Sequence, residues 1–302
     1  MSIVAAAPPQ KVPVFGGFDY VTVDATRRRV YAAHGGNRSL LVVDADKGTV
    51  LGQVRVGPMA GVAFDPKSGT VFTGNGGGRS VSRVDPVALK EISSADLSGD
   101  IDAIAYDPDL NRIYADEDDG THIFVLDATT LKQIGSIDLP GHKPEYLAIN
   151  PKTHEIYQNI DNLHEVVVID PQSLTITKTI DTPELQHNHP LQYDAAFDQI
   201  IVAGSNGVLA VYSPQGKSLY HIDVPAHIDQ CNLDESRHLL ACAGSGKITL
   251  VQIKSDAAPA IVGQIDVARG MHTLAIDPKT GDIWAVWASA DGDFVQRFSV
   301  KS

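Results

Sequence analysis

A short pattern recurs seven times along the chain and limits the folds that the chain can adopt. Each copy contains an apolar run, an Asp or Asn, a few turn-forming residues and a second apolar run. The clearest copies are "GVAFDPKSGTVFTGN" (61–75), "AIAYDPDLNRIYADE" (103–117), "YLAINPKTHEIYQNI" (146–160), "TLAIDPKTGDIWAVW" (273–287) and "YVTVDATRRRVYAAH" (20–34), and weaker copies span 190–204 and 230–244. The Asp or Asn of each copy, called here the anchor residue, is Asp24, Asp65, Asp107, Asn150, Asp194, Asp234 or Asp277.

The spacing of the anchors identifies the repeating unit. Successive anchors lie about 40 to 44 residues apart, and short Val, Ile, Leu and Tyr runs alternate with Gly, Pro, Asn and Asp between them. A repeat of this length that holds four short strands is a blade of a β-propeller. The sequence therefore predicts an all-β fold, a seven-bladed β-propeller with four-stranded antiparallel blades, in a single domain over residues 1–302.

The two ends of the chain are expected to share the last blade. After Asp277 there is room for three strands, and "QKVPVFGG" (10–17) resembles the fourth-strand segments at 52–58 and 263–270. An N-terminal strand that completes the last blade would leave no open sheet edge. Residues 1–9 are predicted to be a disordered tail or the remnant of a signal peptide, because "AAA" followed by prolines resembles a cleavage region. We therefore expect a periplasmic or secreted protein, and a cytoplasmic location stays open.

The stretches "RRVYAAHGGNRSLLVVDADKGTV" (28–50) and "EIYQNIDNLHEVVVIDPQSLTITKTID" (155–181) resemble the YVTN-repeat, or YncE-like, propeller family. The resemblance covers essentially the whole chain and is weaker in blades five and six. It implies the seven-bladed fold, but the motifs are poor guides to activity, because one fold serves many functions. Proteins of this general kind include surface-binding propellers and lactonases, and more distantly similar seven-bladed proteins include metal-dependent lyases.

Charge excludes some partners. The formal net charge is −13 and no basic patch offsets it, so we expect no binding to nucleic acid or to an anionic membrane surface. No apolar run is long enough to span a bilayer. A closed propeller has no sheet edge that demands a partner, and we expect a monomer that acts on a small-molecule substrate.

Polar residues recur where the first strand of each blade begins, at the face where propeller sites usually lie. Five residues before the anchors, six of the seven positions are ionisable; this ring consists of Asp19, Ala60, Asp102, Glu145, His189, Asp229 and His272. Two residues further along each strand, the positions are all apolar or Cys. Four carboxylates that converge on one opening repel one another unless they are protonated or neutralised, and histidines or a bound cation would neutralise them.

The ring predicts a metal site. Mixed imidazole and carboxylate ligands favour a divalent transition metal of the Zn, Mn, Fe or Ni type over Ca²⁺. His189, His272 and Asp229 are the first candidates for ligands, Glu145 is a ligand or a general base, and Asp19 and Asp102 are further candidates. Strand pairing is expected to place His34 opposite Asp19 and Glu117 opposite Asp102, as residues that orient the ligands.

The predicted function is that of a metal-dependent hydrolase, such as a lactonase, or a lyase that acts on a small polar substrate. Glu145 and the rim histidines His187 and His227 are the candidates for proton transfer. Three alternatives stay open: a hydrated channel lining, a metal-free acid–base site, and a non-catalytic propeller that binds a protein, a glycan or a cell-wall component. Cys231 and Cys242 should face each other across two strands, either as a disulfide or as two reduced thiols.

Overall fold

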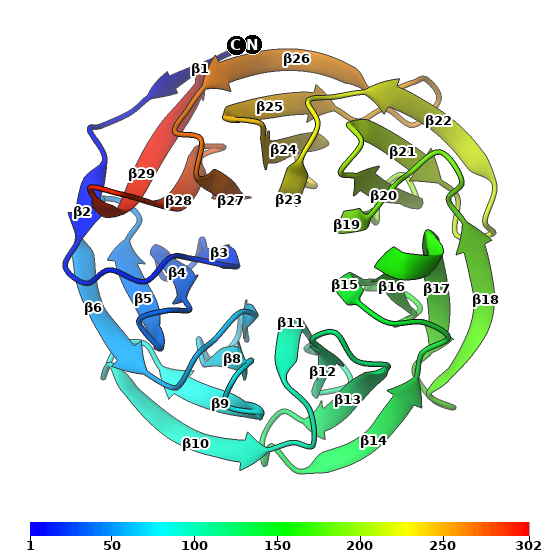
Figure 1. The fold of residues 1–302 in the computed structure, drawn as a ribbon, viewed down its shortest axis with the longest axis horizontal. Coiled ribbons are helices and arrows are strands. Elements are labelled where there is room, and N and C mark those ends of the chain that lie inside the picture. Colours follow the sequence, from blue (N-terminus) through cyan, green and yellow to red (C-terminus); the bar gives the residue numbers. More distant parts are fainter. Residues whose placement is uncertain (302) are drawn as a thin grey trace.

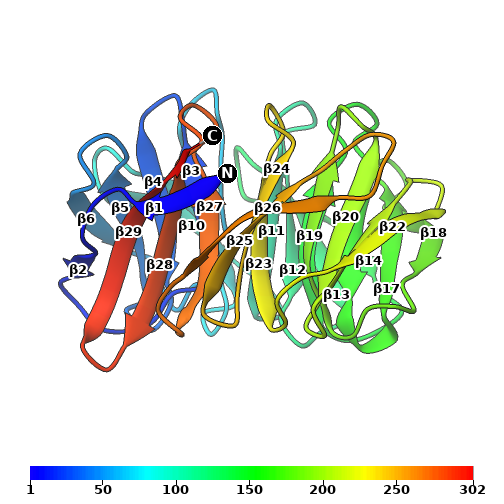
Figure 2. The same ribbon diagram turned by 90° about the horizontal axis from the view of Figure 1, so that it is seen from above.

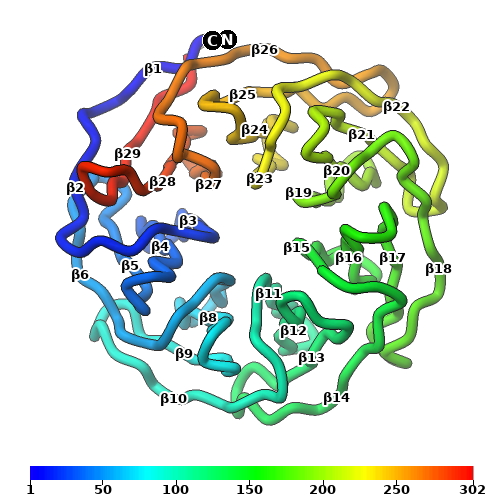
Figure 3. Tube along the Cα trace, viewed as in Figure 1, coloured from blue at the N-terminus to red at the C-terminus, as the bar shows by residue number. Residues whose placement is uncertain are grey.

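The seven repeats form seven antiparallel sheets that radiate from a central channel (Figure 1). The computed structural model describes residues 1–301 of the 302-residue chain. The chain completes one circuit of the ring, and both termini lie at the same point on its outer edge (Figure 3). The predicted all-β, seven-bladed propeller with four-stranded blades is confirmed.

Each blade runs outward from an inner strand at the channel to an outer strand at the perimeter. The inner strands are β3 (Val21–Asp24), β7 (Val62–Phe64), β11 (Ile101–Asp107), β15 (Pro144–Ile149), β19 (Asn188–Asp194), β23 (Ile228–Asp234) and β27 (Met271–Ile276). The second strands are β4 (Arg29–His34), β8 (Val71–Asn75), β12 (Arg112–Glu117), β16 (Ile156–Ile160), β20 (Gln199–Gly204), β24 (Leu239–Gly244) and β28 (Ile283–Ser289).

The third strands are β5 (Ser39–Asp44), β9 (Ser80–Asp85), β13 (His122–Asp127), β17 (Glu165–Asp170), β21 (Val208–Tyr212), β25 (Lys247–Gln252) and β29 (Gly292–Lys301). The outer strands are β6 (Val50–Arg55), β10 (Lys90–Asp96), β14 (Gln133–Asp138), β18 (Thr175–Asp181), β22 (Ser218–Asp223) and β26 (Ala260–Asp266), and β1 (Ser2–Ala5) and β2 (Gln10–Val12) take this place in the last blade. One short 3-10 helix, η1 (Asp161–Leu163), joins β16 to β17.

Burial follows the position of a strand in its blade. Second and third strands such as β5 and β20 are buried at every residue, because both of their faces pack against neighbouring blades. Outer strands such as β18 are mostly exposed and carry polar residues among the apolar ones. The blades stand side by side around the channel, with their strands running roughly parallel to its axis (Figure 2), and the apolar core lies between them. No helix among residues 1–301 is long and apolar enough to cross a membrane.

The N-terminal segment closes the ring in two pieces. Gln10–Val12 pairs with β29 as expected, but Ser2–Ala5 also pairs with β29, near its far end. The expectation of a disordered tail is therefore wrong for Ser2–Ala5. The physical reason is that β29 is ten residues long, so that one short strand leaves part of its edge open. Pro8 and Pro9 lie between the two strands, where they interrupt the ladder because proline has no N–H to donate.

The buried side chain of Asp293 on β29 stabilises the closure of the ring. Its carboxylate accepts hydrogen bonds from the backbone N–H groups of Gly16 and Gly17, at 2.7 and 2.8 Å. It also pairs with Nε2 of His34 on β4, at 2.5 Å, and both side chains are fully buried. One carboxylate thus links the last blade, the N-terminal connection and the first blade.

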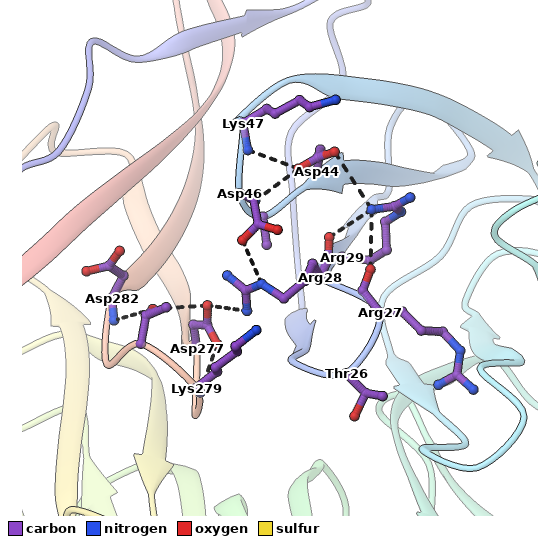
Figure 4. Close-up of polar contacts among 12 residues, drawn as sticks. Thr26, Arg27, Arg28, Arg29, Asp44, Asp46, Lys47, Asp277, Lys279 and Asp282 are labelled. Atoms are coloured by element: carbon purple, nitrogen blue, oxygen red, sulfur yellow. Dashed lines mark hydrogen bonds and ion pairs between the residues drawn. The ribbon is translucent and has the colours of Figure 1, made fainter.

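The anchor residues build the turns on the opposite face. In every blade the anchor side chain accepts a hydrogen bond from the backbone N–H two residues later, which stabilises the turn between inner and second strands. In three blades the residue four positions after the anchor also reaches the anchor of the preceding blade. These pairs are Arg28–Asp277 at 2.7 Å, His154–Asp107 at 2.8 Å and His238–Asp194 at 2.7 Å. Figure 4 shows Arg28 between Asp46 and Asp277 at the junction of the first and last blades.

Cys231 and Cys242 are directly opposite each other on β23 and β24 and form a disulfide, with their Cα atoms 4.1 Å apart. Both are buried beside the channel. The predicted pairing is confirmed, and the alternative of two reduced thiols does not describe this structure.

Candidate active site

The ring residues surround one cavity at the mouth of the channel. All seven positions, Ala60 included, line a space of about 570 Å³ together with Phe18, Tyr20 and Asp118. The residues two positions further along the strands are all buried and belong to the apolar core of the blades: Val21, Val62, Ile104, Leu147, Leu191, Cys231 and Leu274. The ionisable side chains thus line the cavity, and the apolar core begins two residues further along each inner strand.

A β-bulge turns the ring side chains toward the channel. In five blades the pairing of the inner strand with the second strand shifts by one residue at the ring position. In the third blade, for example, Ile101 is opposite Glu117 and Ile104 is opposite Ala115. The inner strand therefore has one residue more than its partner at this point, which reorients the side chain that precedes the regular ladder.

Both predicted orienting residues are wrong, Glu117 because of the bulge and His34 because it pairs with Asp293. Asp102 does not face Glu117, whose carboxylate accepts from Nδ1 of His122, at 2.9 Å, and the backbone N–H of Thr121, at 3.1 Å. His34 is buried inside the first blade, where it pairs with Asp293. Glu117 stabilises a hairpin turn and His34 stabilises the closure, so that neither orients a ring residue.

Two residues that were not predicted from the sequence lie next to Asp102 or to its neighbour Ala103. Tyr20 donates its hydroxyl to Asp102 at 3.4 Å. Asp116 on β12 is fully buried below the ring, where its carboxyl accepts from the backbone N–H of Ala103 at 2.6 Å and from Gln158 at 3.1 Å. A signal for Asp116 exists in the repeats, since the equivalent position holds no acid in the other six: Ala33, Gly74, Asn159, Ala203, Ala243 and Val286.

Four consecutive blades contribute a continuous chain of acids and histidines. Nε2 of His189 lies 2.9 Å from Oε2 of Glu145 and 3.2 Å from Oδ1 of Asp229. The other oxygen of Asp229 pairs with Nδ1 of His272. The order Glu145–His189–Asp229–His272 alternates negative and positive groups, which relieves the repulsion expected of the carboxylates.

The carboxylates Glu145 and Asp229 raise the pKa values of the histidines that they contact. Burial alone would lower the pKa of His189, but the hydrogen bond and charge of Glu145, together with Asp229, raise it from 6.5 to about 9. The hydrogen bond to Asp229 raises the pKa of His272, with burial opposing it. Burial raises the pKa of Asp229, but its two histidine neighbours outweigh this and hold it below its usual value. In the metal-free protein, both histidines therefore favour the protonated form.

The carboxyl groups that do not pair with these histidines have raised pKa values, in contrast to Asp229. Burial and the charge of Asp229 raise the pKa of Asp19 from 3.8 to about 6. Burial and the nearby carboxylates raise the pKa values of Asp102 and Asp116 well above the usual range for aspartate. The carboxyl groups of the site thus have pKa values displaced in opposite directions, an arrangement that suits proton transfer.

The two rim histidines lie outside the central cavity. His187 is 72% exposed and pairs with Asp161 through Nδ1 at 3.0 Å. His227 is exposed and lines a separate, smaller cavity. Both have a positive φ, 51° and 55°, so each occupies a sharp bend that carries its side chain to the rim.

The donor types fit a divalent transition metal, but the side chains point at one another. Among residues 1–301 no group of three or more His, Cys, Asp or Glu side chains has the arrangement of metal ligands. His189 shares Nε2 with two carboxylates, and its buried Nδ1 has no hydrogen-bond partner within these residues. A metal ion at this place would replace the proton between His189 and its two acids, and His189, Asp229, Glu145 and His272 would hold it.

The comparisons with known proteins establish the fold. No protein-family model and no curated protein sequence matches the chain. A structure of hydrazine synthase from Kuenenia stuttgartiensis matches with a TM-score of 0.81 and 16% identity, over 95% of this chain and 96% of that one. A structure of the mitotic checkpoint complex matches with a TM-score of 0.80 and 12% identity, over 99% and 91% of the two chains. At these identities the similarity shows a propeller and no activity, and membership of the YVTN-repeat family stays a prediction.

Proposed function

We propose that the protein is an enzyme that moves a proton on a small polar substrate in the central cavity, with a divalent transition metal as its cofactor. The observation that carries the proposal is the series Glu145–His189–Asp229–His272 at the wall of the central cavity. Ionisable groups with displaced pKa values, gathered in one concavity, are typical of catalytic sites.

The residues of the ring divide the chemistry between them. Asp19, with a pKa of about 6, is suited to take up or release a proton near neutral pH. Glu145 is the second candidate for a base, because only its bond to His189 holds it in place. Asp102, whose pKa is raised by burial and by nearby carboxylates, is suited to donate a hydrogen bond to an oxygen of the substrate. The metal, when bound, supplies polarisation of a carbonyl group or of a water molecule. Hydrolysis of a small cyclic ester, or elimination next to a carbonyl, fits these groups.

Elemental analysis by plasma mass spectrometry tests the cofactor. Protein incubated with divalent ions and then desalted should retain about one equivalent of a transition metal, and a His189→Ala/His272→Ala variant should retain none. His187→Ala is the matched control, because this exposed histidine lies outside the cavity. If the wild-type protein retains no metal, the proposed metal cofactor is refuted. If none of a series of lactones and related esters is turned over, the result counts against catalysis.

A binding propeller is the second candidate, and one observation favours it. Val14 and Phe15, in the connection between β2 and β3, are 44% and 64% exposed. A binding face usually gathers several aromatic residues, and Phe15 is the only one among the exposed large apolar residues of 1–301, so this function ranks second. A ring that holds neither metal nor substrate would favour this second function.

We also propose that the protein works in an oxidising compartment such as the periplasm. The disulfide between Cys231 and Cys242 supports this, because structural disulfides are rare in reducing compartments.

A further inference from the structure

A second cavity adjoins the candidate active site at the top of the last two blades. It has a volume of about 430 Å³ and is lined by His227, Gly244, Ser245, Gly246, Arg269, Met271 and His272. His272 also lines the central cavity. The imidazole of this one residue therefore forms a shared wall between the two spaces.

A short turn opens this second cavity. In the sixth blade only Ser245 and Gly246 separate the paired residues Gly244 and Lys247, and both turn residues have a positive φ, 50° and 70°. The equivalent turn in the first blade has four residues between the paired His34 and Ser39. The rim is thus lower at the sixth blade, and Gly246 adds no side chain to fill the gap.

A second tight turn holds Arg269 at this gap. The N–H of Met271 donates to the carbonyl oxygen of Ala268 at 2.9 Å, which closes a turn with Arg269 and Gly270 at its centre. A side chain at Gly270 would lie 2.5 Å from the carbonyl oxygen of Ala288, so the turn can pack against β28 only with glycine there. The turn fixes the backbone of Arg269 three residues before His272.

The two cavities carry opposite charge. The central cavity is lined by five carboxyl groups: Asp19, Asp102, Asp118, Glu145 and Asp229. No carboxyl group lines the second cavity, whose ionisable residues are His227, Arg269 and His272. Arg269 forms no ion pair within residues 1–301, although the protein has a net charge of −13. An unpaired guanidinium in such an acidic protein is available to a ligand.

We propose that the two cavities form one bipartite substrate site, in which the second cavity binds an anionic group of the substrate, a carboxylate or a phosphate. The guanidinium of Arg269 presents a planar pair of N–H donors that matches either anion. The rest of the substrate passes His272 and reaches the acidic cavity. In the metal-free protein Nδ1 of His272 is engaged with Asp229, and no hydrogen bond within residues 1–301 uses its Nε2, which can contact the substrate. This inference rests on the proposed function for what happens in the central cavity, and it names the substrate class as small anionic molecules.

Binding of inorganic phosphate and of acetate tests the second cavity directly. Both are titrated into chelator-treated protein at constant ionic strength, and binding is followed by calorimetry and by line broadening of ³¹P and ¹³C signals. Arg269→Gln should weaken binding of the anion by about tenfold or more, since hydrogen bonds to charged groups are the strong ones. His227→Gln should weaken it less. Arg38→Gln is the matched control, because Arg38 is also exposed and lies in a top turn, but lines neither cavity.

The outcomes separate this inference from the proposed function. Phosphate that binds through Arg269 and acetate that does not would identify a phosphate site, and the reverse would identify a carboxylate site. Equal binding by wild type and Arg269→Gln, or no binding of either anion by wild type, would overturn the inference. Because chelated protein is used, anion binding does not depend on metal. Protein that binds the anion but never a metal would support this inference and refute the proposed metal cofactor. Protein that binds a metal but no anion would support the cofactor and refute this inference.

Discussion

The pKa of His189 provides the sharpest test of the ring. Its Nε2 lies between Glu145 and Asp229, at 2.9 and 3.2 Å, and its pKa is raised from 6.5 to about 9. This difference corresponds to about 3 kcal/mol in favour of the protonated imidazole in the folded protein. The hydrogen bond that His189 donates to Glu145 is the largest of the contributions that raise the pKa. Glu145→Gln removes that charge and should lower the pKa of His189 by more than about one unit, toward 6.5.

Titration of the histidine Cε1 signals by NMR measures this change in chelator-treated protein. His189→Gln identifies the signal of His189, and Glu117→Gln is a control, because Glu117 contacts His122 and no residue of the ring. An imidazole of His189 that titrates near 6.5 in the wild-type protein would refute the reasoning. The same pKa in wild type and Glu145→Gln would show that Glu145 is not the cause.

The free energy of unfolding should depend on pH through the protonation of His189. The folded-state pKa of His189 lies above the unfolded value of 6.5, so its contribution is fully present below pH 6.5 and is lost as the pH rises through 9. The difference in the free energy of unfolding between wild type and Glu145→Gln should therefore be larger at pH 6 than at pH 10. The proton also competes with a metal at this place, so metal affinity should increase as the pH approaches 9.

Two further predictions concern stability. Asp293→Ala leaves the buried His34 and two backbone N–H groups without their partner, and it should lower the free energy of unfolding, measured in urea, by about 3 to 5 kcal/mol. Asp291→Ala, at an exposed position two residues away, is the control and should change this free energy little. Equal effects of the two variants would contradict the role of Asp293 in closing the ring. Replacement of both Cys231 and Cys242 by serine should lower the same free energy by about 3 kcal/mol, because the disulfide closes a loop with a sequence separation of 11 residues. A change under about 1 kcal/mol would mean that the unfolded chain is not constrained by this bond.

The fold could be predicted because the anchors have a structural cause that repeats. Each anchor side chain closes the same turn, so that the sequence has to supply Asp or Asn at one position in every blade. That constraint makes the period visible and fixes which residues begin the inner strands. The ring positions followed from the period alone, and all of them line the cavity.

The partners of the ring positions across the strands could not be predicted, because the bulge has no sequence signal of its own. The shift of one residue changes the partners of the ring positions, such as Asp102 and Glu117, and leaves pairs beyond the bulge, such as Cys231 and Cys242, in the expected register. The role of Ser2–Ala5 was missed for a different reason. The length of β29, which decides how much edge must be covered, depends on a strand that has no equivalent in the other blades.

The repeats also offer a criterion that separates scaffold from site in this chain. The anchor turns appear in all seven blades and explain the ring of sheets, so they need no ligand to account for them. The acid–histidine chain occurs in four neighbouring blades, and Asp116 occurs in one. The shortened turn at Ser245 and Gly246 opens the second cavity beside the end of that chain. These departures from the repeat contribute nothing to closing the propeller, and a partly buried network of charges costs free energy to maintain. Their convergence on two adjoining cavities is therefore best explained by a ligand, which is the reason to examine His189, His272 and Arg269 together.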